Sequence, residues 1–115
     1  MKRTVLERLE DMMFYGADAE AFAEGMTLET LKNDRKTSFA LVRALEVIGE
    51  AAKHIPDEIR KKYPHIPSRE ISGMRDRLAH GYFGIDYDLL WATVQERVPV
   101  LIADLKVVIE NEQPK

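Results

Sequence analysis

The side chains best suited to chemistry are concentrated in one short segment, residues 74–82. His80 follows Asp76 by four positions, so the two would share a face of a helix. An imidazole titrates near neutral pH, and a carboxylate bound to one ring nitrogen fixes the tautomer and orientation of the other. Arg75 supplies a permanent cation, and Tyr82 adds a phenol two turns from it. This set favours acid–base chemistry beside a bound anion.

Each of these residues also has an ordinary structural explanation. A lone histidine in a helix is usually structural or simply exposed, and a tyrosine at a helix end usually packs there. His80, however, lies nearly opposite the apolar stripe expected of the same helix. That stripe consists of Ile71, Met74 and Leu78. The position of His80 therefore argues against a core histidine.

Arg75 and His80 do not point the same way on one straight helix. Five positions separate them, which corresponds to a divergence of about 140°. Either the helix end distorts at Gly81, or two copies of the chain meet and share a site. The second possibility predicts a homodimer with its site at the two-fold interface.

Helical periodicity dominates the rest of the sequence, and no run alternates apolar and polar residues for long enough to predict a strand. The expected long helices cover about residues 3–24, 34–54 and 68–82, and a last one runs from Asp86 or Asp88 to about 110. Short helical pieces are expected at 27–31 and 57–63. Asp34 is suited to cap the second long helix, whereas Thr27 followed by Thr30 gives only a weak capping signal. Pro99 should kink or restart the last helix.

These elements predict an all-α fold, an antiparallel four-helix bundle with short connecting helices. The 115 residues suffice for a single domain over 1–115, with a frayed tail at about 111–115. Cysteine is absent, which excludes disulfides and thiol catalysis, and no apolar run is long enough for a membrane span. A cytoplasmic protein is expected. The net charge of −3 argues against a simple duplex coat but leaves room for local contacts to a few nucleotides.

The motif Arg75-x-x-x-x-His80-x-Tyr82 resembles the R-x-x-x-x-H-x-Y signature of HepT-like toxins, which belong to the HEPN superfamily of helical ribonucleases. The resemblance extends from about residue 3 to 110. It includes residues 45–52, with the sequence Leu-Glu-Val-Ile-Gly-Glu-Ala-Ala, and the segments flanking the motif at 66–71 and 82–91. Two positions depart from the family pattern: Asp76 stands where asparagine is more frequent, and Ser68 where many relatives carry tryptophan.

The resemblance implies a HEPN-like fold and a metal-independent endoribonuclease that uses the RNA 2′-hydroxyl as internal nucleophile. His80 would move protons, Arg75 would stabilise the charge developing on phosphate oxygens, and Asp76 would orient His80. No cofactor is implied. The family also implies an antitoxin partner, a minimal nucleotidyltransferase of the MntA type. This partner would transfer AMP from ATP to Tyr82 and block the site by charge and bulk.

Three weaker signals accompany the motif. Glu50 and His54 are one turn apart, but no third ligand is visible, so we expect no metal site. Arg43, Glu46 and Glu50 share a helix face, which is either a salt-bridged surface or one wall of the cleft opposite His80. A modest basic rim for RNA, or an ordinary charged surface, is formed by Lys61, Lys62, Arg69 and Arg77.

Two functions stay open at this point. One is an RNA-cleaving toxin neutralised by a nucleotidyltransferase. The other is a catalytically idle helical subunit that presents a substrate or nucleotide to a nucleotidyltransferase, with Arg75 binding phosphate and His80 serving as a contact residue.

Overall fold

The computed structural model describes residues 3–66, 71, 73, 77–78 and 84–114 of the chain. All the secondary-structure elements named in these residues are helical. In chain order they are α1 (Val5–Ala23), α2 (Leu28–Lys32), α3 (Arg35–Lys53), α4 (Asp57–Lys62), α6 (Tyr87–Ala92), the π-helical segment η2 (Thr93–Arg97) and α7 (Val98–Glu112). The expectation of an all-α fold is confirmed.

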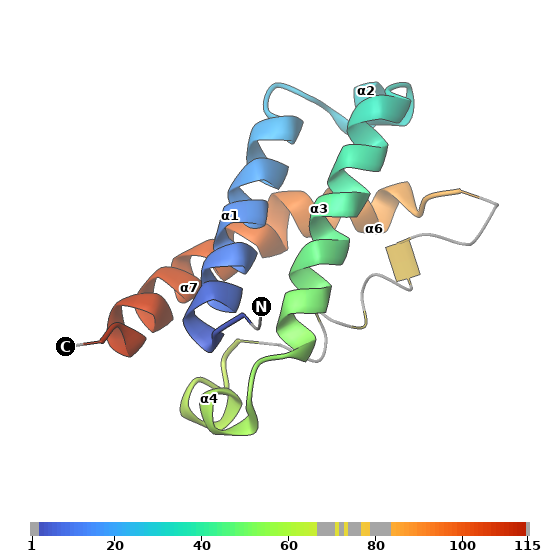
Figure 1. The fold of residues 1–115 in the computed structure, drawn as a ribbon. Coiled ribbons are helices and arrows are strands. Elements are labelled where there is room, and N and C mark those ends of the chain that lie inside the picture. The colour runs from blue at the N-terminus through green and yellow to red at the C-terminus, as the bar shows by residue number, and fades with distance from the viewer. Residues whose placement is uncertain (1–2, 67–70, 72, 74–76, 79–83, 115) are drawn as a thin grey trace.

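The three long helices enclose the core. Figure 1 shows α1 and α3 side by side and antiparallel, with the continuous run of α6, η2 and α7 crossing behind them. The predicted four-helix bundle also requires the helix expected at 68–82. Ile71, Gly73, Arg77 and Leu78 are helical, and the other residues of that range lie outside the described part of the chain.

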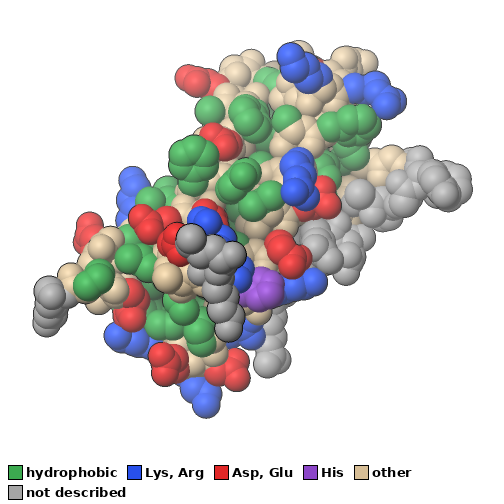
Figure 2. Space-filling view, viewed as in Figure 1, with side chains coloured by type: hydrophobic (Ala, Val, Ile, Leu, Met, Phe, Trp, Pro, Cys, Tyr) green, Lys and Arg blue, Asp and Glu red, His purple; other side chains and the backbone are tan. Residues whose placement is uncertain are grey.

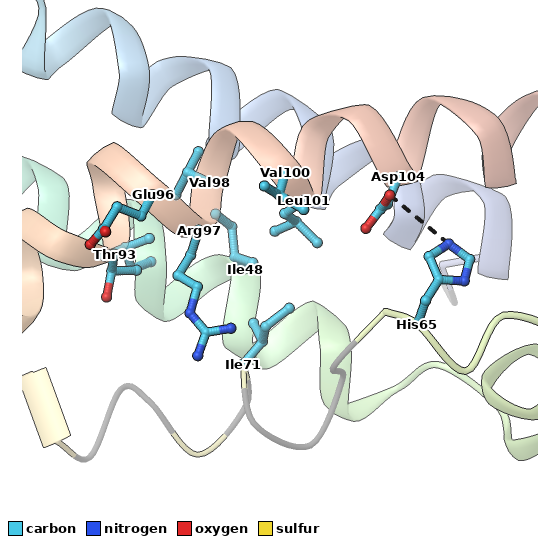
Figure 3. A pocket seen from close by; sticks show the side chains of 11 residues that line it. Ile48, His65, Ile71, Thr93, Glu96, Arg97, Val98, Val100, Leu101 and Asp104 are labelled. Atoms are coloured by element: carbon cyan, nitrogen blue, oxygen red, sulfur yellow. Dashed lines mark ion pairs between the residues drawn. The ribbon is translucent and has the colours of Figure 1, made fainter.

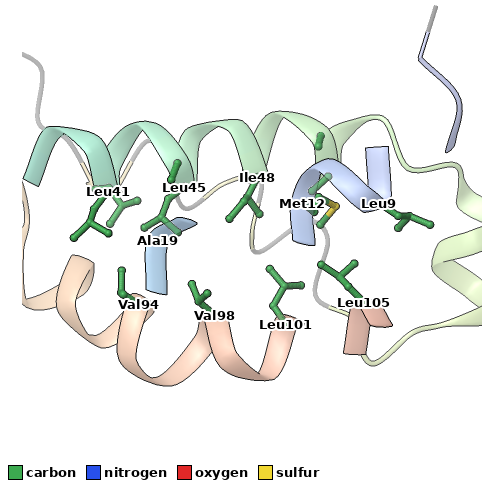
Figure 4. Packing of buried hydrophobic residues seen from close by; sticks show 14 of the residues in the cluster. Leu9, Met12, Ala19, Leu41, Leu45, Ile48, Val94, Val98, Leu101 and Leu105 are labelled. Atoms are coloured by element: carbon green, nitrogen blue, oxygen red, sulfur yellow. The ribbon is translucent and has the colours of Figure 1, made fainter. Parts of the chain in front are cut away.

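Periodic apolar side chains of α1, α3 and α7 meet in one buried cluster (Figure 4). Its labelled members are Leu9, Met12 and Ala19 from α1, Leu41, Leu45 and Ile48 from α3, and Val94, Val98, Leu101 and Leu105 from η2 and α7. Burying a large aliphatic side chain contributes about 1.5–3 kcal/mol, so this cluster is the main source of stability. Within the described residues, no helix is both long enough and apolar enough to cross a membrane.

Helix α1 begins with a capping box, a signal separate from its apolar periodicity. The Thr4 hydroxyl accepts a hydrogen bond from the Glu7 backbone N–H, and the Glu7 carboxylate accepts one from the Thr4 N–H. The helix therefore starts at Val5 rather than at about residue 3. Gly25, with φ of 76°, follows its end, close to the helix end expected at about residue 24.

Close contact between α1 and α7 depends on Gly16. A Cβ placed on this residue would lie 3.1 Å from Cγ1 of Ile102. Glycine therefore lets the two helices approach at this point, and any side chain here would push Ile102 aside.

The caps around α2 and α3 differ in part from the prediction. Thr27 and Thr30 form a reciprocal capping box at the start of α2, so the threonine at the third position is a full substitute for Glu or Gln, and the weak signal was underestimated. Asp34 caps α3, as predicted, by accepting from the Thr37 N–H at 2.9 Å. The buried Ser38 hydroxyl contacts the Leu31 and Asp34 carbonyls, which ties α2 to α3.

Pro99 was predicted to kink or restart the last helical run, and α7 begins one residue before it, at Val98. Asp86 caps α6 by accepting from the Leu89 N–H, and Pro99 lies in the first turn of α7. Proline cannot donate a backbone hydrogen bond and its ring crowds the preceding turn. The π-helical segment η2 directly before α7 accommodates this interruption while the chain stays helical.

Candidate functional site

The predicted site residues Arg75, Asp76, His80 and Tyr82 lie outside the described residues. The structure does describe neighbours of these residues in the sequence and the elements that hold those neighbours. We define residues 63–86 as the connecting stretch. Its described residues that position the motif are Ile71, before the motif, and Leu78, within it, together with the contacts at either end of the stretch.

Two apolar residues join the motif segment to the core. Leu78 is fully buried in the hydrophobic cluster, and Ile71 is partly buried against it. These residues are seven positions apart and were both predicted for the buried stripe, so this part of the prediction is confirmed. The third predicted member, Met74, lies outside the described residues. Arg77, next to Leu78, is exposed.

The C-terminal end of the motif segment is held by the backbone. The Asp86 N–H donates a hydrogen bond of 2.9 Å to the carbonyl of Leu78. Asp86 also caps α6 through its side chain. One residue therefore fixes both the return of the chain to Leu78 and the start of the last helical run.

The N-terminal end of the connecting stretch is held by α7. The buried Tyr63 donates a 2.6 Å hydrogen bond from its hydroxyl to Glu112, and Lys62 forms a 2.7 Å ion pair with the same carboxylate. The Lys62 ammonium, followed by the Tyr63 hydroxyl, lowers the pKa of Glu112 from its ordinary value. Glu112 in turn raises the pKa of Lys62. Lys62 is thus engaged with α7 rather than only part of a basic rim.

A cavity of about 200 Å³ lies beside Ile71. Its walls are mostly apolar, and charged groups stand among them (Figure 3). The lining residues are Leu45, Ile48, His65, Ile71, Thr93, Glu96, Arg97, Val98, Val100, Leu101 and Asp104. An apolar hollow with a few polar groups, next to the segment that carries the motif, has the general character of a binding site.

Four titratable side chains at this cavity were not among the predicted site residues: His65, Glu96, Arg97 and Asp104. Figure 3 shows the Arg97 side chain extending from η2 toward Ile71. His65 lies 4.0 Å from a carboxylate oxygen of Asp104, and this contact joins the connecting stretch to α7. The sequence carried little signal for Arg97 or His65, because both approach the motif segment only through the tertiary fold.

The structure also places the shared face of Arg43, Glu46 and Glu50. These side chains line a surface hollow between α3 and α1, together with Arg8 and Asp11. Glu50 contacts Lys53 at 3.9 Å and His54 at 3.6 Å. Within the described residues, Glu50 is therefore paired along its own helix, as expected of a salt-bridged surface.

Glu50 and His54 contact each other directly, at the exposed end of α3. Among the described residues, no three His, Cys, Asp or Glu side chains are grouped so as to hold a metal ion. The histidines with described surroundings, His54 and His65, each face one carboxylate.

Comparison with known proteins identifies a family and several relatives of this chain. A family model described as Ribonuclease HepT-like matches residues 6–108. A Methanocaldococcus jannaschii protein named "Putative RNase" is 41% identical over 114 residues, covering 99% of this chain and 98% of the relative. A Thermococcus cleftensis protein named "Probable ribonuclease HepT" is 46% identical over 101 residues, covering 88% of this chain and 92% of the relative.

A Caldanaerobacter subterraneus protein, also named "Putative RNase", is 40% identical over 90 residues, covering 78% of this chain and 80% of that protein. No solved structure shows significant similarity to the chain. The family match spans α1, α3, the whole motif segment and most of α7. The chain belongs to the HepT-like ribonuclease family.

Proposed function

We propose that the protein is a metal-independent endoribonuclease, the toxin of a toxin–antitoxin pair. The observation that carries this proposal is the family match over residues 6–108, which contains the complete Arg75-x-x-x-x-His80-x-Tyr82 motif. The printed names of the relatives, which call them ribonucleases, support the same reaction class.

The proposed reaction breaks one P–O5′ bond in RNA. The 2′-hydroxyl loses its proton and its oxygen bonds to the adjacent phosphorus, while the 5′-oxygen leaves and receives a proton. His80 is proposed to move protons in this step, because an imidazole exchanges protons near neutral pH. Arg75 is proposed to stabilise the negative charge that accumulates on the phosphorane oxygens, and Asp76 to orient His80.

A homodimer follows from the same motif. Because Arg75 and His80 diverge by about 140° on one helix, the proposed site combines groups from two copies at a two-fold interface. Mixing inactive Arg75→Ala and His80→Ala proteins tests this directly. Mixed dimers with a composite site should regain part of the RNA-cleaving activity, whereas a mixture of proteins whose sites lie within one chain would stay inactive.

Regulation is proposed to act on Tyr82. A nucleotidyltransferase antitoxin of the MntA type would attach the AMP moiety of ATP to the phenol oxygen and release pyrophosphate. The added phosphate charge and bulk beside Arg75 and His80 would compete with the RNA phosphate. Intact mass of the protein, isolated with and without such a partner, shows whether Tyr82 carries AMP, and Tyr82→Phe should never gain that mass.

The deciding experiment is cleavage of total cellular RNA in EDTA by wild-type protein, His80→Ala and a matched control, His54→Ala. His54 pairs with Glu50 on the surface of α3, so it controls for the loss of an imidazole. We expect wild type and His54→Ala to cut RNA and His80→Ala to lose cutting without loss of helicity or melting temperature. Wild-type protein of unmodified mass that cuts no RNA would contradict the proposal and favour the substrate-presenting subunit.

A further inference from the structure

The solvent-exposed face of α3 carries two different surfaces. Arg35, Phe39 and Arg43 follow one another at intervals of four residues on its N-terminal half. Glu46 and Glu50 continue nearly the same stripe on the C-terminal half. The exposed face therefore changes from basic and aromatic to acidic along one helix.

The N-terminal half is joined by two lysines, Lys32 at the end of α2 and Lys36 on α3, both exposed. Residues 30–45 contain four basic residues and one acidic residue, in a chain whose net charge is −3. That one acidic residue, Asp34, accepts hydrogen bonds from the Thr37 N–H and hydroxyl, so its carboxylate is engaged at the helix start. Figure 2 shows Lys and Arg side chains gathered over the end of the molecule where α2 and α3 begin. We define Lys32, Arg35, Lys36, Phe39 and Arg43 as the basic–aromatic strip.

Phe39 is the unusual member of this strip. Its side chain is 54% exposed, although a phenylalanine gains free energy from burial. The guanidinium of Arg35 lies 4.9 Å from the centroid of its ring. This cation–π contact orients the ring and keeps a positive charge beside it. An exposed aromatic ring among cations is what proteins use to stack a base and bind its phosphates.

We propose that the basic–aromatic strip binds a single-stranded stretch of RNA, with a base stacked on Phe39 and phosphates bound by the surrounding cations. This inference rests on the proposed function, because it assigns part of the RNA substrate to this strip. From Arg35 to Arg43 the strip spans about 12 Å of helix, which suits a short run of nucleotides.

A second copy of the chain fits the strip less well than RNA. In an antiparallel pairing of two α3 helices, Arg43 would meet Glu46 of the other copy. In each copy, however, Glu50 already pairs with Lys53 and His54 of its own helix, so its charge is engaged before any second copy binds. Lys32 and Lys36 lie beyond the acidic stripe and would have no counterpart in such a pairing. The excess of cations favours a polyanion.

The test measures binding separately from cleavage. Fluorescence anisotropy with a labelled 12-nucleotide 2′-O-methyl oligouridylate reports affinity, because this RNA lacks the nucleophilic hydroxyl. We expect Phe39→Ala to weaken binding about tenfold, since base–aromatic stacking contributes about 1–3 kcal/mol per base. Phe39→Trp should retain binding. Phe14→Ala is the matched control: Phe14 is 66% exposed on α1 and lies outside the strip, so its loss should leave affinity unchanged.

The contribution of the cations can be measured from the salt dependence of RNA affinity. Each phosphate contact on a single strand contributes about 0.7 to the slope of log affinity against log salt concentration. Arg43→Gln and Lys36→Gln should each flatten that slope by about this amount. On cleavable RNA, Phe39→Ala should raise KM and leave kcat unchanged.

The outcomes separate this inference from the proposed function. RNA binding that depends on Phe39, in a protein that cuts nothing, would support the strip and contradict the nuclease. Cleavage with Phe39→Ala affinity equal to wild type would overturn the strip alone. A change in sedimentation from dimer to monomer in Phe39→Ala would also overturn it, because the face would then be an interface between copies.

Discussion

The three long helices and the connecting stretch at 63–86 are held in different ways. Helices α1, α3 and α7 share one extended core in which many aliphatic side chains are almost fully buried. Of the described residues in the connecting stretch, Tyr63 and Leu78 belong to that core, and Ile66, Ile71 and Ile85 pack against it. Tyr63 and His65 also contact Glu112 and Asp104 of α7. Stability should therefore be concentrated in the long helices, and function in a segment that depends on a small number of anchors.

The largest loss of stability is expected from Leu105→Ala. Leu105 is completely buried between the long helices, and truncation removes apolar contacts and leaves a cavity. The free energy of unfolding should fall by about 2–5 kcal/mol, measured by urea denaturation. Val107→Ala, on the same helix but 53% exposed, is the control and should change it by less than about 0.5 kcal/mol. Equal effects of the two variants would contradict the concentration of stability in this core.

Leu78→Ala removes the main anchor of the motif segment. Leu78 is as buried as Leu105, so the unfolding free energy should fall within the same range of about 2–5 kcal/mol. Unlike Leu105→Ala, the Leu78→Ala substitution should also lower RNA cleavage at temperatures where helicity is intact, because the neighbouring motif loses the buried side chain that anchors it. Comparing kcat of the two variants well below both melting temperatures checks this. If both retain wild-type kcat, Leu78 is only a packing residue.

The same contrast explains what the sequence could predict. The sequence predicted the extent of α3, its Asp34 cap, a cap at Asp86 or Asp88, and a kink or restart at Pro99, because each depends on residues within a few positions. The Arg75–Tyr82 motif was recognisable for the same reason, because it consists of particular residue types at a fixed, short spacing. The placement of its residues stays a prediction.

Other features depend on residues far apart in the chain and had no local signal. The contact of Tyr63 with Glu112 joins residues 49 positions apart, and Arg97 reaches the cavity beside Ile71 from η2. The buried hydroxyl of Ser38 is explained only once α2 packs on α3. Sequence patterns therefore predicted the helices better than the contacts that connect them.

Tyr63→Phe should have a smaller effect that is confined to the connecting stretch. The ring stays in the core, and only the hydroxyl that donates to Glu112 is lost. The free energy of unfolding should fall by about 1 kcal/mol. Hydrogen exchange should accelerate around residues 62–66 while the amides of α1 and α3 keep their protection. Uniform acceleration over all helices would show that this contact supports the whole fold.

The smallest effect is expected from the charge of Glu112, and it should depend on pH. The pKa of Glu112 is lowered in the folded state, chiefly by Lys62 and then by Tyr63. Its contribution is therefore fully present above the ordinary pKa of a glutamate, about 4.3, and is lost as the pH falls through the lower, folded value. The raised pKa of Lys62 acts only at the alkaline end, where its contribution disappears as the pH rises through the folded value.

A double-mutant cycle with Lys62→Gln and Glu112→Gln isolates this pair. Urea denaturation should show coupling between the two substitutions at neutral pH and its loss on acidification through the lowered pKa of Glu112, where the carboxylate becomes neutral. Added salt should weaken the coupling at neutral pH, because the ammonium is exposed to solvent. Coupling that persists at acid pH would mean that packing rather than charge joins α4 to α7. The connecting stretch would then be anchored as the core is, and the contrast between the two regions would disappear at this end.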